Sequence, residues 1–222
     1  MTSIKSSVES FLESTPNGVT IVAVTKTVSI EMIKEAIHAG ITNIGENKVQ
    51  EAEEKFPELY KYNLKWHLIG RLQTNKVKKA LKIFDLIHSV DRIDLARFIN
   101  SESEKINKVQ DVLLQINTSL EESKAGFFPD DENLINLLKE ISFMRNIKVK
   151  GLMTIGANTT DTLLVKESFF KLKVLKDKIN DMNFFSEKLN ILSMGMTNDY
   201  HLALEEGSNM IRVGRALFGD RK

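Results

Sequence analysis

One lysine and two glycine-containing segments carry the chemistry that this 222-residue sequence offers. Lys26 directly follows an apolar, β-branched run at residues 19–25, which predicts a strand with a lysine at its end. A lysine amine in a partly apolar pocket can lose its proton and attack a carbonyl carbon, forming a Schiff base. The position alone fits equally well a lysine that begins a solvated loop.

The two glycine-containing segments are LSMGMTND and RVGRALFG, near the end of the chain. Ser193 offers a hydroxyl, while Gly195 and Gly214 allow backbone N–H groups to approach a ligand closely. A helical turn beginning near Arg215 would aim its positive end at an anion. Each glycine alone is weak evidence, because strand-to-helix turns use glycine anyway. Together the two segments predict a phosphate site.

The elements that must position these residues alternate between strand-like and helix-like patterns. Predicted strands occupy residues 19–25, 41–45, 64–69, 83–90, 109–116, 147–155, 189–193 and 210–214. Predicted helices occupy residues 29–40, 47–56, 75–81, 92–106, 130–141, 165–179 and 200–205. Ser29 opens the first of these helices, and Asp130 or Asp131 can cap the helix that ends at 141.

Eight strand–helix units of about 25 residues each favour a compact α/β fold, a single (β/α)8 (TIM) barrel. An extra N-terminal helix at residues 3–14 precedes it, and no linker interrupts the chain, so we expect one domain over residues 1–222. A doubly wound open sheet is the alternative, but no G-x-G-x-x-G follows the first strand. In a barrel, reactive residues should lie at the carboxyl ends of the strands, with phosphate bound after strands seven and eight.

Composition narrows the class of partner. Lys and Arg number 31 against 30 Asp and Glu, a net charge of +1, which gives no basic field for a nucleic acid. We therefore expect no nucleic-acid partner, and we interpret the charged stretches 76–82 and 51–54 as solvated helix faces. No apolar run is long enough to cross a membrane, no secretory signal is recognisable, and cysteine is absent, so we expect no membrane partner and a cytoplasmic location. No close histidine spacing indicates a metal site.

In a closed barrel the first and eighth strands are neighbours, so Lys26 would face the phosphate segments. That pairing suits pyridoxal 5′-phosphate (PLP), which has an aldehyde for the lysine and a phosphate for the two segments. Arg212, on the last strand, would reach the pyridine nitrogen. An arginine there disfavours protonation of that nitrogen, so the ring is a poorer electron sink than one paired with aspartate.

The sequence resembles the PLP homeostasis protein family, single-domain relatives of the alanine racemase N-terminal barrel. The resemblance spans nearly the whole chain in matching order and spacing. The matching segments are VAVTK, GENKVQE, KWHLIGRLQTNK, EESKAGF, GLMTI, LSMGMTND and IRVGRALFG.

The resemblance implies a cofactor site. Lys26 would carry the Schiff base, Arg212 would face the pyridine nitrogen, and Ser193, Gly214 and Arg215 would hold the phosphate. Positions that surround the cofactor in the family are matched by Asn47, His67, Met153, Met194, Gly195 and Met196. Lys48, Thr197 and Arg215 depart from residues common in the family. If contact at 215 is through the backbone N–H, the arginine leaves it intact; if it is through a hydroxyl, one contact is lost.

The resemblance implies a PLP-binding protein of vitamin B6 and amino-acid homeostasis, without turnover, with PLP-dependent apo-enzymes as recipients of the cofactor. We expect a monomer, because the second domain that forms the usual racemase dimer interface is missing. The alternative is an amino-acid racemase. Racemases of this type add a second domain and a tyrosine base, and the tyrosines here, Tyr60, Tyr62 and Tyr200, lie in no segment resembling that motif. A sugar-phosphate isomerase or aldolase ranks last, because strands five and six end in Asn117 and Thr154 and offer no carboxylate. His67 and His88 are otherwise structural histidines, and His38 and His201 are solvated helix residues.

Overall fold

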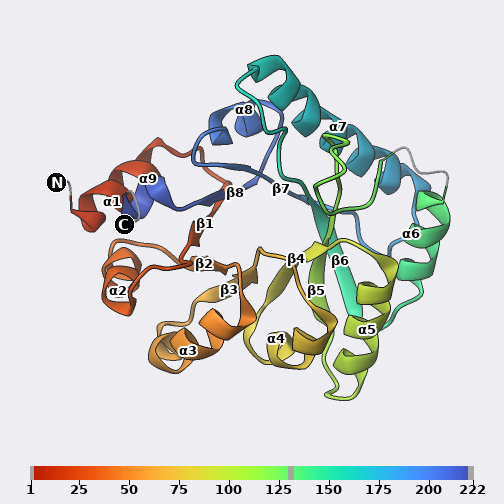
Figure 1. Ribbon diagram of the computed structural model, residues 1–222, viewed down its shortest axis with the longest axis horizontal. Helices are drawn as coiled ribbons and strands as arrows, with labels where there is room; N and C mark the ends of the chain where they lie inside the picture. Colours follow the sequence, from red (N-terminus) through yellow and green to blue (C-terminus); the bar gives the residue numbers. More distant parts are fainter. Residues whose placement is uncertain (1–2, 130–132, 220–222) are drawn as a thin grey trace.

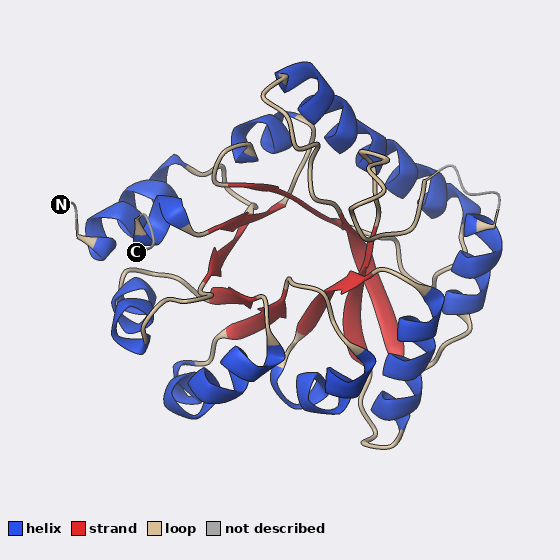
Figure 2. Ribbon diagram, in the orientation of Figure 1, coloured by secondary structure: helices blue, strands red, loops and turns tan. Residues whose placement is uncertain are grey.

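Eight parallel strands close into a barrel in the order β1 to β8, and the helices surround it (Figures 1 and 2). The computed structural model describes residues 3–129 and 133–219. The strands are β1 (Thr20–Val24), β2 (Asn43–Glu46), β3 (Lys65–Leu68), β4 (Leu86–Val90), β5 (Gln110–Gln115), β6 (Ile147–Met153), β7 (Ile191–Met196) and β8 (Met210–Val213). The predicted (β/α)8 barrel is therefore confirmed, and the open sheet is excluded by the pairing of β1 with β8.

Helices connect successive strands, as a right-handed parallel barrel requires. They are α1 (Ile4–Ser14), α2 (Ile30–His38), α3 (Val49–Leu59), α4 (Val77–Ile83), α5 (Ile93–Glu104), α6 (Leu134–Ser142), α7 (Thr162–Met182), α8 (Tyr200–Glu205) and α9 (Arg215–Phe218). Short 3-10 helices at Tyr60–Tyr62 and Thr74–Lys76 add to them. The first and last helices, α1 and α9, pack against each other where the chain's ends meet (Figure 1). None of the described helices is both long and apolar enough to cross a membrane.

Capping and spacing explain the first unit. Ser29 caps α2, because its side chain accepts a hydrogen bond from the N–H of Met32 at 3.4 Å. Ile33 and Ala36 then lie buried on one face, and the helix ends before Gly40, whose φ of 112° suits glycine. The helix predicted between Ser29 and Gly40 is thus confirmed: α2 begins one residue after Ser29 and ends two residues before Gly40.

Two strand boundaries were wrong by several residues. The fourth strand begins at Leu86, not at 83, because Ile83 still belongs to the last turn of α4. The seventh strand continues past Ser193 to Met196, and so carries most of the LSMGMTND segment on a strand. An apolar run alone does not tell a buried helix turn from a strand start. The predicted caps Asp130 and Asp131 lie outside the described residues.

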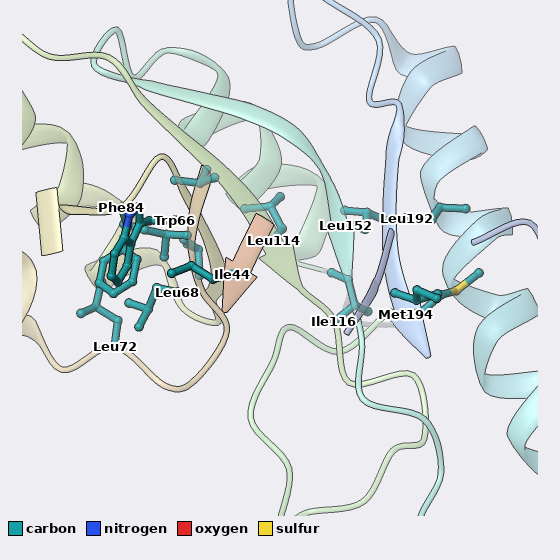
Figure 3. Packing of buried hydrophobic residues seen from close by; sticks show 14 of the residues in the cluster. Ile44, Trp66, Leu68, Leu72, Phe84, Leu114, Ile116, Leu152, Leu192 and Met194 are labelled. Atoms are coloured by element: carbon teal, nitrogen blue, oxygen red, sulfur yellow. The ribbon is translucent and has the colours of Figure 1, made fainter. Parts of the chain in front are cut away.

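The apolar core has two layers. The larger lies between barrel and helices, where Figure 3 shows Trp66, Leu68, Leu72 and Phe84 gathered together. A separate cluster contains no helical residue and fills the inside of the barrel, since its members alternate with outward-facing ones along their strands. The inner cluster consists of Val22, Leu86, Leu113, Met153 and Met210. These apolar side chains therefore pack part of the barrel interior.

Candidate functional site

A cavity of about 1070 Å³ lies at the carboxyl ends of the strands, bounded by the segments that follow β1, β5, β6, β7 and β8. This is the end where barrels carry their reactive residues. Five of the predicted site residues line it: Lys26, Met196, Arg212, Gly214 and Arg215. The structure thus brings the strand-one lysine and the strand-eight arginine to one cavity.

Lys26 reaches the cavity because of strand alternation. Val22 faces the barrel interior, so Val24 and Lys26 follow on the same side and both Val24 and Lys26 line the cavity. Lys26 is half-buried, whereas Thr25 on the other side is fully buried. The chain turns immediately afterwards at Thr27, whose φ is 60°. The lysine is therefore held at the rim by a fixed turn and does not begin an open loop.

Behind Lys26, a set of mostly buried groups holds the end of β1 against α3. We call it the ion-pair clamp; it is made of the side chains of Thr25, Glu46, Glu51 and Lys55 and the backbone N–H of Thr27. Lys55 Nζ donates to Glu46 Oε1 at 2.8 Å, to Glu51 Oε1 at 2.7 Å and to the Thr25 carbonyl at 2.7 Å. The Thr25 hydroxyl donates to Glu46 Oε1 at 2.7 Å, and the Thr27 N–H donates to Glu51. The clamp fixes the backbone on both sides of Lys26.

Burial shapes the charges in the ion-pair clamp. It raises the pKa of Glu46 above its ordinary value, although Lys55 and Thr25 donate to its carboxylate. Burial also opposes ionisation of Glu51, but hydrogen bonds from Lys55 and the Thr27 N–H prevail and lower its pKa. The sequence-based interpretation of Glu51 as part of a solvated helix face was wrong: the side chain is half-buried and accepts a hydrogen bond from the Thr27 N–H, in the turn after β1.

Arg212 is the buried cation of the site. Its Nη1 donates to the Ser193 carbonyl and hydroxyl, both at 2.7 Å, and its Nη2 donates to the Thr154 carbonyl at 2.8 Å. Burial lowers the pKa of Arg212 to about 10, so the side chain remains a cation at neutral pH. Among the described residues no carboxylate forms an ion pair with it, and its Nε–H and one Nη2–H find no acceptor. These donors suit a ligand acceptor in the cavity.

The phosphate segments meet at the start of α9. The Gly214 N–H lies 3.4 Å from Thr197 Oγ1, to which it donates, and Arg215 Nη2 donates to Asn198 Oδ1 at 3.0 Å. All four residues line the cavity. The sequence identified Thr197 only as a departure from residues common in the family, and the fold places it beside Gly214. Hydroxyl, backbone N–H and guanidinium donors here form a set suited to an anion.

The other predicted site residues do not line the cavity. Ser193 is fully buried beneath Arg212, Met153 belongs to the inner apolar cluster, and Met194 faces outward into the larger core (Figure 3). Gly195 has a φ of 92°, and a Cβ there would lie 2.7 Å from that of Ala203, so it lacks a side chain because α8 packs on it. Asn47 packs against Gly70, and His67 lies inside the barrel. Direct ligand contact by these residues stays a prediction.

The four histidines divide between surface and interior. His38 is exposed at the end of α2, as expected, and His201 is exposed on α8 but also lines the cavity. His67 and His88 are buried, the latter completely. Within the described residues no group of three histidine, aspartate or glutamate side chains is arranged to hold a metal ion.

Comparison with protein families gives one match over the whole chain: the alanine racemase N-terminal domain matches residues 1–222. Among characterised proteins, the pyridoxal phosphate homeostasis protein of Aquifex aeolicus is 42% identical over 206 residues, covering 93% of this chain and 89% of that protein. The family resemblance read from the sequence motifs is therefore confirmed.

Solved structures extend the comparison. PipY of Synechococcus elongatus, solved with PLP bound, is 34% identical with a TM-score of 0.89, covering 97% of this chain and all of that one (100%). Alanine racemase of Clostridium difficile 630 is 15% identical with a TM-score of 0.84, covering 99% of this chain but 60% of that one. The second likeness shows a shared barrel fold.

Proposed function

Because this chain belongs to the alanine racemase N-terminal domain family and, within it, to the pyridoxal phosphate homeostasis proteins, we propose that it is a cytoplasmic carrier that binds PLP reversibly through Lys26. The observation that carries the proposal is the meeting of Lys26 and Arg212 on one cavity. The proposed role is to buffer PLP for vitamin B6 and amino-acid balance and to deliver it to apo-enzymes, as a monomer and without turnover.

The donors around the cavity fit the cofactor. PLP supplies an electrophilic aldehyde, a ring nitrogen that accepts a hydrogen bond and a doubly charged phosphate. The chain offers groups for each part of the cofactor: the Lys26 amine for the aldehyde, the two unpaired N–H groups of Arg212 for the ring nitrogen, and the donors of Thr197, Gly214 and Arg215 for the phosphate. A cavity of about 1070 Å³ exceeds what one small aromatic phosphate fills.

The proposed work of these residues is binding and orientation. The ion-pair clamp fixes the backbone at Thr25 and Thr27, so the amine of Lys26 is presented from a rigid strand end. Arg212 remains protonated and therefore acts toward a ring nitrogen only as a hydrogen-bond donor. An unprotonated ring nitrogen withdraws fewer electrons, which restrains chemistry at a bound amino acid. Storage and release are the activities that such a site favours.

The second face of the site supports the proposed absence of turnover. Racemisation needs an acid or base on each side of the substrate, and Lys26 serves one side. None of the described lining residues is a tyrosine. The lining groups that could serve the other side in a racemase are Glu121, Lys124, Asp199 and His201. Lys124 donates to Glu121, to Ser119 and to the Gly156 carbonyl, and Asp199 accepts a hydrogen bond from the Met196 N–H.

The test is reductive trapping. Purified protein incubated with PLP should gain a visible absorbance band, and borohydride should then leave a pyridoxyl group on Lys26, located by peptide mass mapping. Lys26→Ala should abolish trapping, whereas Lys48→Ala, a change at an exposed lysine, should leave it intact.

A reducible adduct that persists on another lysine in Lys26→Ala would contradict the assignment of Lys26. Sustained formation of a D-amino acid from L-alanine would overturn the non-catalytic role, and a dimer mass in solution would overturn the monomer.

A further inference from the structure

Beneath the cavity, a chain of hydrogen bonds crosses the inside of the barrel; we call it the histidine relay, made of Asn43, His67, His88, Ser193 and Arg212. Arg212 Nη1 lies 2.7 Å from Ser193 Oγ, which lies 3.0 Å from His88 Nδ1. His88 Nε2 lies 2.9 Å from His67 Nδ1, and His67 Nε2 lies 3.0 Å from Asn43 Oδ1. Five strands thus contribute one polar side chain each.

When both rings are neutral, the two ends of the histidine relay fix the direction of every bond in it. Arginine only donates and an amide oxygen only accepts. His67 must therefore donate from Nε2 to Asn43, and must accept at Nδ1 the Nε2–H of His88. His88 accepts at Nδ1, so the Ser193 hydroxyl donates to it and accepts from Arg212. The Asn43 amide nitrogen donates to Thr42 Oγ1 at 3.0 Å, which agrees with this orientation of the amide.

Burial and charge agree with two neutral imidazoles. Burial lowers the pKa of His67 to about 4, and it lowers the pKa of His88 well below the ordinary value, with His67 and Arg212 acting in the same direction. In the arrangement given above, an extra proton at Nδ1 of either ring would face a donor unless a neighbouring proton moved. Both rings are therefore neutral at pH 7, with the proton on Nε2.

The histidine relay determines how Arg212 is held. The guanidinium is bound by uncharged acceptors alone among the described residues: the Ser193 hydroxyl and the carbonyls of Ser193 and Thr154. Because the Ser193 proton is committed to His88, its hydroxyl oxygen is turned toward Arg212 as an acceptor. The positive charge is not neutralised from behind, and the unpaired N–H groups remain for the cavity side.

We propose that His88 and His67 are positioning residues for Arg212, which they act on through Ser193 so that the guanidinium presents its free donors to the ring of a bound PLP molecule. This inference rests on the proposed function for the identity of the ligand. The relay itself does not, because its bonds are complete within the chain. Neither histidine touches the cavity, so both act on the ligand through other residues.

The relay is tested first without any ligand, by nitrogen NMR of the histidine rings at pH 7. The expected spectra show His67 and His88 as neutral rings protonated at Nε2. A cationic ring, or a proton on Nδ1 of His88, would overturn the relay. Failure of the parent protein to trap PLP on Lys26 would instead overturn the proposed function and, with it, the ligand named here, so the two failures are distinguishable.

The positioning role is tested on the PLP-loaded protein with His88→Leu, His88→Gln and the exposed control His38→Gln. His88→Leu should weaken PLP binding by roughly tenfold or more and shift the visible band, because a bond in the chain to a charged group is lost. His88→Gln keeps one acceptor and one donor and should restore part of both. Should His88→Leu fail to fold, Ser193→Ala, which removes one oxygen atom, should give the same weakening. Unchanged affinity and spectrum in a folded His88→Leu or Ser193→Ala would refute the proposal.

Discussion

The ion-pair clamp and the histidine relay each hold one cavity residue in place, but they differ in whether the positive charge is paired with carboxylates inside the cluster. In the clamp, Lys55 contacts two carboxylates and a carbonyl, so its charge is matched within the cluster. In the relay, the one cation is Arg212, and its acceptors are uncharged. The clamp pairs its cation with carboxylates, although Glu46 Oε2 has no hydrogen-bond partner among the described residues, whereas the relay leaves the charge of Arg212 without an ion pair and two of its N–H donors available.

This difference separates the structural cluster from the ligand-binding one. A buried cation that is paired with carboxylates positions the backbone, and here it fixes both residues beside Lys26. A buried cation without a carboxylate partner is costly and is retained where a ligand supplies the missing acceptor. The clamp therefore holds the lysine in place, and the relay holds the arginine ready for the ligand. The experiments below separate these two roles.

The largest effect is expected from Lys55→Met, which leaves Glu46 buried without its cation. Removing one partner of a buried pair costs about 3–5 kcal/mol of unfolding free energy. The loss should be greatest at neutral pH and smaller toward pH 5, because Glu46, whose pKa is already raised, then takes up a proton. Urea unfolding at both pH values measures it. The double variant Glu46→Gln with Lys55→Met should recover much of the loss; equal losses in the single and double variants would contradict a charge-based clamp.

The next largest effect is expected from acid, which should lower the stability of the protein through the buried histidines of the relay. His67 has a pKa of about 4 in the folded protein against an ordinary value of 6.5, so the unfolded chain binds the proton more readily. Stability is therefore fully present above pH 6.5 and falls as the pH drops toward 4, by about 3 kcal/mol for this one group. Unfolding curves between pH 7 and 4 measure the loss, and His67→Gln should flatten it. A parent protein equally stable at pH 4.5 and 7 would show that the rings are not buried neutral.

A smaller effect is expected from Thr25→Val, which keeps the shape of the side chain and removes its hydrogen bond to Glu46. A bond to a charged group contributes roughly 1.5–3 kcal/mol, and the loss should fall near the lower end because Lys55 still serves the same oxygen. Thr20→Val, at the half-buried start of β1, is the matched control and should change the unfolding free energy by less than about 0.5 kcal/mol. PLP trapping on Lys26 should become slower in Thr25→Val alone.

Much of the fold was predictable because alternating apolar runs and caps are local signals. The run before Lys26, the cap at Ser29 and the helix Tyr200–Glu205 are all where the sequence placed them. Predicted strand boundaries were wrong where one apolar run covers both a helix end and a strand start, as at Ile83. The site was predictable in part: Lys26, Arg212 and Arg215 line the cavity, whereas Ser193, expected at the phosphate, lies under Arg212.

The clamp and the relay escaped sequence analysis because their members are far apart in the chain. Ser193 and His88 are 105 residues apart and share a hydrogen bond only because the barrel closes. Glu51 has the i, i+4 spacing to Lys55 that predicts a pair, but the sequence does not show that the pair faces inward against β1. A single histidine on a strand carries no sign of its partner.

The sequence by itself determined the barrel, the lysine at the end of β1 and the family. The hydrophobic periods of strands and helices, and the order of the motifs, are properties of residues close together in the chain. Only the tertiary structure decided which polar groups are satisfied and which are left for a ligand. Whether a buried cation meets a carboxylate depends on distances between strands, and these distances cannot be read from the order of residues in the chain. Lys55 and Arg212 are both buried cations, and closure of the barrel gives the first its carboxylates and leaves the second without one among the residues described.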